Sequence, residues 1–358
     1  MAGLFPPQER YWNLDAQVHL TPQAAERVSR ESAQSPFDLA ARSVNSDWAT
    51  RYDGKQMQRW AEHYGHKVAG DQERERRSYL KGKRPAGPEN APALLAIGMD
   101  GGRVQERQKD PQSQSRWHED KVLTVSSYGK AKVQEPGADP PPVRLVTTCL
   151  GTMQDSGKFG QLARVEAERR GIRQATEVVI IGDGAAWIDT VAGEHFACHT
   201  RIIDFYHVDE RLSAVARAIL PVQERQRKRL ASRLEGQLWH GKVATIIRWI
   251  RKKAQALGKP RESDPADHPR RVLWENLTYL ERHQSQMNYP AYRANGWPIG
   301  SGVTESGVKL FNKRVKGTEQ FWNRPGVEAI LALRALYLSQ DDRWRHYWLY
   351  GQLLRKAA

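Results

Sequence analysis

Five short apolar runs between residues 93 and 208 constrain the fold of this chain more than any other feature. Apolar runs of this length are typical of buried strands. The first three follow one another directly, whereas helical patterns separate the last three. The expected order is therefore three strands, a helix, a strand, a helix and a strand. The runs are ALLAIGM (93–99), KVLTVSSY (121–128), VRLVTTCLGT (143–152), EVVIIGDG (177–184) and TRIIDFYHV (200–208).

This order is typical of the ribonuclease-H-like fold, in which crossover helices add parallel strands to an antiparallel run of three. We therefore predict an α/β fold with a ribonuclease-H-like mixed sheet, whose first part spans 93–208. Helical periodicity throughout 209–290 predicts an all-helical insertion. The rest of the core, at 291–358, would contain a helix that carries Glu305 and the C-terminal helices.

The segment before the sheet is predicted to form a small N-terminal helical region over 1–70 and a polar, proline-rich linker over 71–92. We expect short helices here, the third of which ends at Gly65. Such helices fit a helix-turn-helix unit that docks on DNA. They equally fit a subdomain that only packs against the core.

The charge balance limits the partners of this chain. Lys and Arg number 56 against 41 Asp and Glu, a net charge of +15, which predicts a polyanionic partner. No stretch reaches the roughly 18–20 apolar residues of a membrane span, and the first ten residues lack a signal-peptide pattern. Two cysteines, Cys149 and Cys198, cannot form a CxxC zinc site. We expect a cytoplasmic protein that binds nucleic acid and no membrane.

Three acidic residues occupy positions that suit catalysis. Asp100 ends the first apolar run and is followed by two glycines. Asp183 lies between two glycines directly after the fourth run, and Glu305 lies in the first turn of a predicted helix. Each has a structural alternative, because an Asp at a strand end can cap a turn and a Glu in a first turn pairs with the helix dipole.

The chemistry that such carboxylates support is phosphodiester cleavage and joining. Both the attacking and the leaving oxygen need neutralisation, which two divalent ions about 3.5–4 Å apart provide. Mg²⁺ prefers carboxylate oxygens and retains waters, so a few Asp or Glu side chains in an open cleft are enough. Asp100, Asp183 and Glu305 are therefore predicted to bind two Mg²⁺ or Mn²⁺ ions.

Several motifs around these acids resemble bacterial insertion-sequence transposases of the ISKra-four family, over roughly residues 90–340. The similarity covers the segments around the three acids and three further segments. They are MDGGRV (99–104), IGDGAAWI (181–188), WPIGSGVTES (297–306), KLFNKRVKG (309–317), FW (321–322) and ALRALYL (332–338).

The resemblance implies a DDE triad of Asp100, Asp183 and Glu305 that cleaves transposon ends and transfers strands into target DNA. It also implies transposon terminal inverted repeats as a partner, a homo-oligomer on DNA and a bacterial, nucleoid-associated location. Related transposases often carry a Cys-rich zinc-ribbon-like segment, which this chain lacks, so no segment is assigned to terminal-repeat recognition. Two other functions stay open: a nuclease or junction resolvase on the same fold, and a catalytically decayed DNA-binding protein.

The ISKra-four family resembles Mutator-like transposases, whose last core strand carries a (C/D)xxH element. Asp204-Phe-Tyr-His207 fits this pattern. The resemblance implies that Asp204 and His207 support the metals or the substrate, although a buried Asp–His pair that holds the strand end fits equally well. Asp204 is also the main competitor of Asp183 as the second carboxylate.

Two further sets of residues are candidates for contact with DNA. Trp187, Trp297 and Trp322 could stack on unpaired bases, or could pack in the core. Basic residues on the helix after Glu305 are predicted to contact phosphates: Lys309, Lys313, Arg314 and Lys316. The insertion could extend this surface through Lys228, Arg229, Arg248, Arg251, Lys252 and Lys253.

Overall fold

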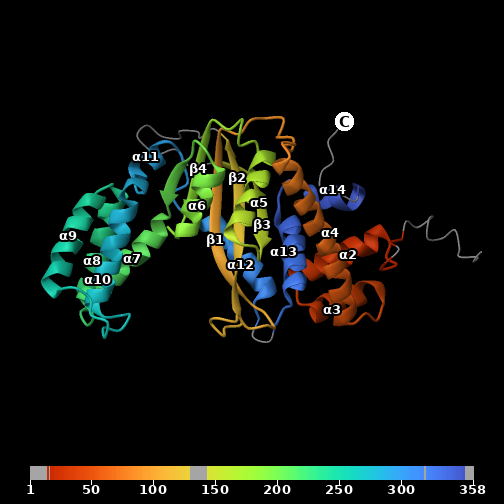
Figure 1. Cartoon of the computed structure of the whole chain (residues 1–358), viewed down its shortest axis with the longest axis horizontal. Helices are drawn as coiled ribbons and strands as arrows, with labels where there is room; N and C mark the ends of the chain where they lie inside the picture. Colours follow the sequence, from red (N-terminus) through yellow and green to blue (C-terminus); the bar gives the residue numbers. More distant parts are fainter. Residues whose placement is uncertain (1–13, 16, 130–142, 318–319, 351–358) are drawn as a thin grey trace, which may run out of the picture.

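The computed structural model describes residues 14–15, 17–129, 143–317 and 320–350. Its centre is a five-stranded mixed sheet of order β3-β2-β1-β4-β5 (Figure 1). The first three strands are antiparallel, and β4 and β5 join in parallel beyond β1. The predicted order of strands and helices is confirmed, and the chain is a mixed α/β protein. The strands are β1 (Leu94–Gln105), β2 (Trp117–Gly129), β3 (Val143–Thr152), β4 (Glu177–Gly182) and β5 (Thr200–Ile203).

The β1–β2 hairpin is longer than the sequence predicts. The expectation that the first strand ends at Asp100 is wrong, because β1 continues to Gln105. It pairs with β2 without interruption, from Leu94 opposite Tyr128 to Gln105 opposite Trp117. The two glycines after Asp100 therefore lie within a ladder of hydrogen bonds rather than in a turn.

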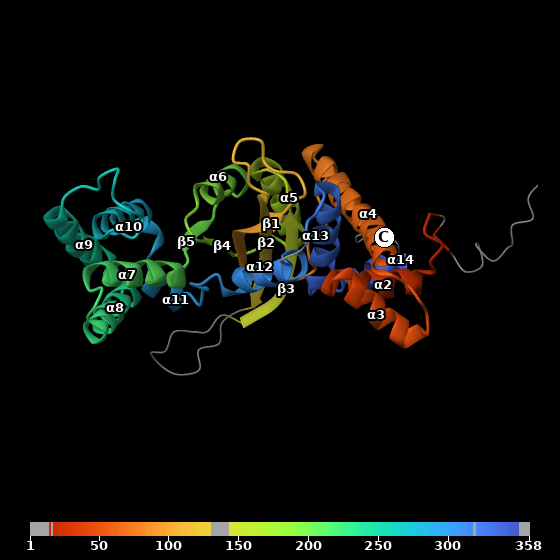
Figure 2. The same ribbon diagram turned by 90° about the horizontal axis from the view of Figure 1, so that it is seen from below.

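Helices cover both faces of the sheet (Figure 2). On one face, α5 (Ser156–Arg169) and α6 (Ala186–His195) pack on the alternate apolar residues of β1. On the other face lies α12 (Gly302–Val315). A Cβ atom at Gly98 of β1 would lie only 1.7 Å from Thr304 Oγ1. The absence of a side chain at Gly98 therefore lets α12, and Glu305 with it, approach the centre of the sheet.

The N-terminal helices pack against α13 (Arg324–Leu338) and α14 (Arg343–Tyr350). The prediction that the third helix ends at Gly65 is wrong, since that helix continues to Leu80 and takes up the first part of the predicted linker. A Cβ atom at Gly65 would lie 2.3 Å from the carbonyl oxygen of Ala329 in α13, so this glycine permits a close helix crossing. The helices are α2 (Pro22–Gln34), α3 (Phe37–Trp48) and α4 (Gly54–Leu80). Their docking on DNA stays a prediction.

The segment after β5 is helical, as its periodicity predicts, and forms an arm at one end of the molecule (Figure 1). The predicted strand over 200–208 is wrong in its second half. It ends at Ile203, because the carboxylate of Asp204 accepts a hydrogen bond from the backbone of His207 and starts a helix. The arm contains α7 (Phe205–Ile219), α8 (Glu224–Trp239), α9 (Val243–Leu257), α10 (Pro269–His283), the 3₁₀ turn η1 (Gln284–Gln286) and α11 (Tyr289–Ala294).

Within the described ranges, none of the helices combines the length and the apolar character that crossing a bilayer requires.

Candidate active site

Asp100 lies near the middle of β1 and is half-buried. Its carboxylate accepts a hydrogen bond of 2.7 Å from the backbone N–H of Gly101. The pKa of Asp100 is raised to about 6, first because the carboxyl is buried and then because Asp183, Glu305 and Asp204 place negative charge near it. Four carboxylates from different parts of the sequence therefore share one electrostatic environment.

Asp183 follows directly after β4, beside Asp100 on the neighbouring strand. Its carboxylate accepts the backbone N–H of Ala185 at 2.9 Å, and its carbonyl oxygen accepts the hydroxyl of Tyr279 at 2.7 Å. Gly184 has φ of +86°, and a Cβ atom there would lie 3.1 Å from Tyr279 Oη and from His283 Nε2. Gly184 thus allows both the turn after Asp183 and the close approach of α10.

Glu305 lies in the first turn of α12, as predicted. Its carboxylate accepts a hydrogen bond of 3.2 Å from Ser301 Oγ and lies 3.6 Å from the ammonium group of Lys309, one turn later. Both Glu305 and Lys309 are substantially exposed. A surface pair of this kind contributes little free energy, so the carboxylate is free to exchange it for another cation.

Asp204 has a different place from the three acids above, because it is almost completely buried at the start of α7. Its two carboxylate oxygens accept the backbone N–H groups of His207 and of Ser301, the residue that precedes α12. Among the described contacts, the alternative of an Asp–His pair between side chains is not formed, since His207 Nε2 accepts a hydrogen bond from Arg211 Nε at 3.2 Å. Asp204 therefore ties the end of β5 to the turn that presents Glu305.

A further buried carboxylate, Asp120 of β2, was not predicted. Its side chain faces Gly102 and Asn312 of α12. Within the described part of the chain, neither of its carboxylate oxygens has a hydrogen-bond partner. The pKa of Asp120 is raised to about 6, first by burial and then by the charges of Glu119 and Asp100.

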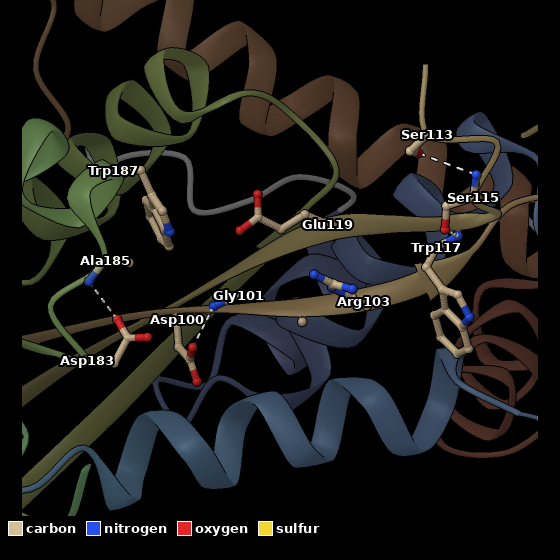
Figure 3. Close-up of a pocket in the computed structure, with 11 residues that line it drawn as sticks. Asp100, Gly101, Arg103, Ser113, Ser115, Trp117, Glu119, Asp183, Ala185 and Trp187 are labelled. Carbon is tan, nitrogen blue, oxygen red and sulfur yellow. Dashed lines mark hydrogen bonds between the residues drawn. The ribbon is translucent and has the colours of Figure 1, made fainter. Parts of the chain in front are cut away.

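A cleft of about 570 Å³ opens beside these residues (Figure 3). Asp100 and Asp183 lie at one end of the cleft together with Trp187, and Trp117 lies at the other end. Arg103 and Glu119 lie between the two ends (Figure 3). The described residues that line the cleft do not include Glu305, whose carboxylate is near enough to act on the pKa of Asp100 from the α12 side.

The residues present fit a pair of hard divalent ions in their chemistry. Among the described residues, no three His, Cys, Asp or Glu side chains are gathered into a ready-made metal site. Neither Asp100 nor Asp183 forms a salt bridge with a described residue, although both carry negative charge in a shared environment. A cation would relieve this repulsion. The oxygen-only donors suit Mg²⁺ or Mn²⁺, which keep several waters of their own.

The three tryptophans of the predicted DNA surface lie in different environments. Trp187 lines the cleft, edge-on to Phe159 at 5.5 Å. Trp297 is partly buried against the helical arm and stacks on Tyr292 at 5.9 Å. Trp322 lies in the core, where its indole N–H donates to the carbonyl of Val315 at 2.8 Å. The prediction that Trp322 stacks on bases is therefore corrected, since its ring is covered by the protein.

The basic residues of α12 divide between its two sides. Lys309, Lys313 and Lys316 are exposed, as contact with phosphates requires. Arg314 is completely buried, and its Nε donates to the carbonyl of Ser32 at 2.6 Å. Burial lowers the pKa of Arg314 to about 9. The prediction that Arg314 contacts phosphates is wrong here, because this side of the helix packs against the N-terminal helices.

The basic residues proposed for the helical arm are all exposed. Two of them form surface ion pairs, Lys228 with Glu224 at 2.7 Å and Arg251 with Glu281 at 2.9 Å. Their part in DNA binding stays a prediction.

No sequence pattern pointed to Trp117 or Tyr279. The predicted first strand ended at Asp100, so the outer half of the hairpin that carries Trp117 was not predicted. Tyr279 is separated from Asp183 by 96 positions, and no local pattern relates a residue of α10 to the end of β4.

No known protein-family model and no curated protein sequence matches this chain.

Proposed function

We propose that this protein is a metal-dependent DNA transposase with a ribonuclease-H-like core. Its substrates would be the terminal inverted repeats of an insertion sequence and target DNA, and it would act as a homo-oligomer on DNA. The observation that carries the proposal is the environment of Asp100, whose pKa is raised by burial and by Asp183, Glu305 and Asp204. Like charges held together without a cationic side chain at Asp100 or Asp183 are typical of a site that binds cations.

The arrangement of the sheet supports the ribonuclease-H-like assignment. Three antiparallel strands come first, and two crossover connections then add β4 and β5 in parallel. One acid lies on β1, one follows β4, and one comes from a later helix that packs on the sheet. This distribution of the acids over the elements supports a DDE triad.

In this proposal some side chains bind the metal ions and others bind the substrate. Bound Mg²⁺ or Mn²⁺ supplies neutralisation of the attacking and leaving oxygens. Asp100, Asp183 and Glu305 would hold the ions, and Glu305 would leave Lys309 to do so. Asp204 keeps the turn before α12 in place through Ser301. Freed Lys309 would join the exposed lysines of α12 in binding phosphate.

The decisive experiment uses the purified full chain and DNA that carries the inverted repeats flanking its gene. With Mg²⁺ we expect cleavage at these ends, and joining of a pre-cut 3′-hydroxyl end to target DNA. Asp183→Ala abolishes both reactions while DNA binding persists. Glu224→Ala, which removes an exposed acid of the helical arm, is the control and retains activity. Cleavage by Asp183→Ala would overturn the proposal, and cleavage without joining would assign a nuclease instead.

A further inference from the structure

The outer part of the β1–β2 hairpin carries an exposed aromatic ring at the far end of the cleft. Trp117, the first residue of β2, lies opposite Gln105 and is 38% exposed. The ammonium group of Lys316, at the end of α12, lies 5.2 Å from the centre of its ring. Arg103 lines the same cleft, between Trp117 and the acids. At one end of the cleft an aromatic ring therefore lies beside the cation of Lys316, whereas Asp100 and Asp183 make the other end acidic.

A second exposed ring lies at the edge of the same hairpin. Phe321 is 40% exposed, and the guanidinium of Arg116 lies 5.4 Å from the centre of its ring. An isolated bridge between Glu106 and Trp322 fixes this segment beside β1. Arg107 Nε also donates to the carbonyl of Phe321 at 3.3 Å. Because Arg116 and Trp117 are consecutive, the two aromatic–cation pairs lie at the same end of the hairpin.

Packing does not explain these two rings. The adjacent Trp322 is buried in the core and has its indole hydrogen bond satisfied. Trp117 and Phe321, in contrast, keep more than a third of their surface in water, where an exposed cation–π pair contributes only about 0.5–1 kcal/mol. While the two rings stay in water, the favourable free energy of burying them is not gained. Binding of a further aromatic surface would recover it.

We propose that Trp117 and Phe321, with Arg103, Arg107, Arg116 and Lys316, form a track that binds an unpaired DNA strand and leads it to Asp100 and Asp183. Unpaired bases present their faces to aromatic rings, whereas a duplex keeps those faces covered by its own stacking. The cations pair with the phosphates between the bases. The cleft volume lies within the roughly 300–1,000 Å³ typical of small-molecule pockets, which suits separate nucleotides.

This inference rests on the proposed function, because it specifies the form in which DNA reaches the acidic residues. It predicts that a transposon end is bound with its strands separated near the site of cleavage. The net charge of +15 alone would attract duplex and single strands alike. The property that identifies the track is therefore a preference for single-stranded over duplex DNA that depends on the two rings.

The test measures fluorescence anisotropy of labelled oligonucleotides with the full chain in EDTA, so that no cleavage takes place. The probes are a single strand, a blunt duplex and a duplex with a 3′ overhang, at one salt concentration. We expect Trp117→Ala and Phe321→Ala each to weaken binding of the single strand by roughly 5- to 100-fold, as loss of base stacking does. Binding of the blunt duplex should change less than about twofold, since phosphate contacts persist.

The helical arm offers a matched control. Trp239 is 39% exposed, and the guanidinium of Arg293 lies 3.6 Å from its ring centre, but it belongs to α8. Trp239→Ala should leave all three affinities unchanged, and Trp117→Phe should retain most of the single-strand affinity because a ring remains. Thermal unfolding verifies that each variant is folded.

The inference is overturned if Trp117→Ala and Phe321→Ala bind the single strand as the wild type does. It is equally overturned if they weaken the duplex as strongly as the single strand, or if Trp239→Ala has the same effect. The proposed function fails separately, through cleavage by Asp183→Ala. Asp183→Ala should bind the single strand normally in EDTA, so the two proposals are distinguishable.

Discussion

Two groups of buried or half-buried charged residues in this molecule differ in whether their charges are paired. On α5, Glu166 receives two hydrogen bonds, of 2.7 and 3.1 Å, from the guanidinium of Arg343 in α14. Arg343 also donates to Asp341, which pairs with Arg170 at 3.0 Å. At the sheet, by contrast, Asp100 and Asp183 have only backbone donors as partners among the described residues.

The difference in pairing distinguishes charges that stabilise the fold from charges that are available to a ligand. A buried charge that is fully paired holds elements together, here α5 and α14. Buried like charges without a cation destabilise the folded chain, as the raised pKa of Asp100 indicates. A protein retains such an arrangement where a ligand supplies the missing charge.

Breaking the paired group should have the largest effect. Glu166→Ala leaves the completely buried Arg343 with one carboxylate fewer, so we expect the free energy of unfolding to fall by about 3–5 kcal/mol. Chemical denaturation measures this change. The exposed pair of Glu224 and Lys228 is the control, and Glu224→Ala should leave the stability unchanged. A loss of stability no larger than that of the control would contradict the contrast.

Neutralising an unpaired carboxylate should raise the free energy of unfolding rather than lower it. The pKa of Asp100 and that of Asp120 are raised from 3.8 to about 6. The folded chain therefore binds their protons more tightly than the unfolded chain, and stability falls as pH rises from about 4 to 6. At pH 8 without metal, Asp100→Asn and Asp120→Asn should each stabilise by at most about 3 kcal/mol, and by less for the partly exposed Asp100.

The same two variants provide their own pH control. The gain in stability should vanish near pH 4, where the wild-type carboxyls are themselves protonated. Thermal unfolding in EDTA across this pH range measures it. Destabilisation by both variants at pH 8 would show that these carboxylates contribute to folding. Only Asp100→Asn should abolish cleavage.

Supplying the missing charge should stabilise the wild type. At ten times its Kd, Mg²⁺ adds about 1.4 kcal/mol to the free energy of unfolding at pH 8. The effect should weaken below about pH 6, because Asp100 must lose its proton to bind the ion. Thermal unfolding with and without Mg²⁺ measures it. Asp183→Asn should lose the effect while Asp120→Asn retains it, and a response that survives in Asp183→Asn would place the ion elsewhere.

The smallest effect concerns the support of Asp183. Tyr279→Phe removes the hydrogen bond to the carbonyl oxygen of Asp183, at a cost of about 0.5–1.5 kcal/mol. We also expect a several-fold higher Mg²⁺ concentration for half-maximal cleavage. Tyr289 is the matched control, because its hydroxyl donates to the carbonyl of Ile203 at 3.1 Å in the same arm. An equal Mg²⁺ requirement in Tyr279→Phe and Tyr289→Phe would refute a positioning role.

Local patterns in the sequence were enough to predict part of this structure. The order of strands and helices follows from apolar runs and periodicity. The position of Asp183 after β4 follows from the glycines that flank it. Prediction from the sequence failed where contacts between distant segments decide the structure. The continuation of β1 beyond Asp100 depends on pairing with β2, and the passage of α4 through Gly65 depends on contact with Ala329.

The same limit applies to the candidate site. Arg314 and Lys313 are neighbours with the same charge, yet one lies in the core and the other in water. A basic run along a helix does not reveal which side will be covered. Trp322 was predicted to contact DNA and is buried, while Trp117, in a polar stretch, is exposed in the cleft.

The amino-acid sequence alone determined the order of strands and helices in the sheet, the position of Asp183 directly after a strand and that of Glu305 in the first turn of a helix. Such choices depend on neighbouring residues, through backbone preference and the spacing of apolar side chains. Only the tertiary structure decided which charges are paired, which aromatic rings stay in water and which carboxylates share an environment. These outcomes depend on burial and on the distance between charges, and both are set by segments far apart in the chain.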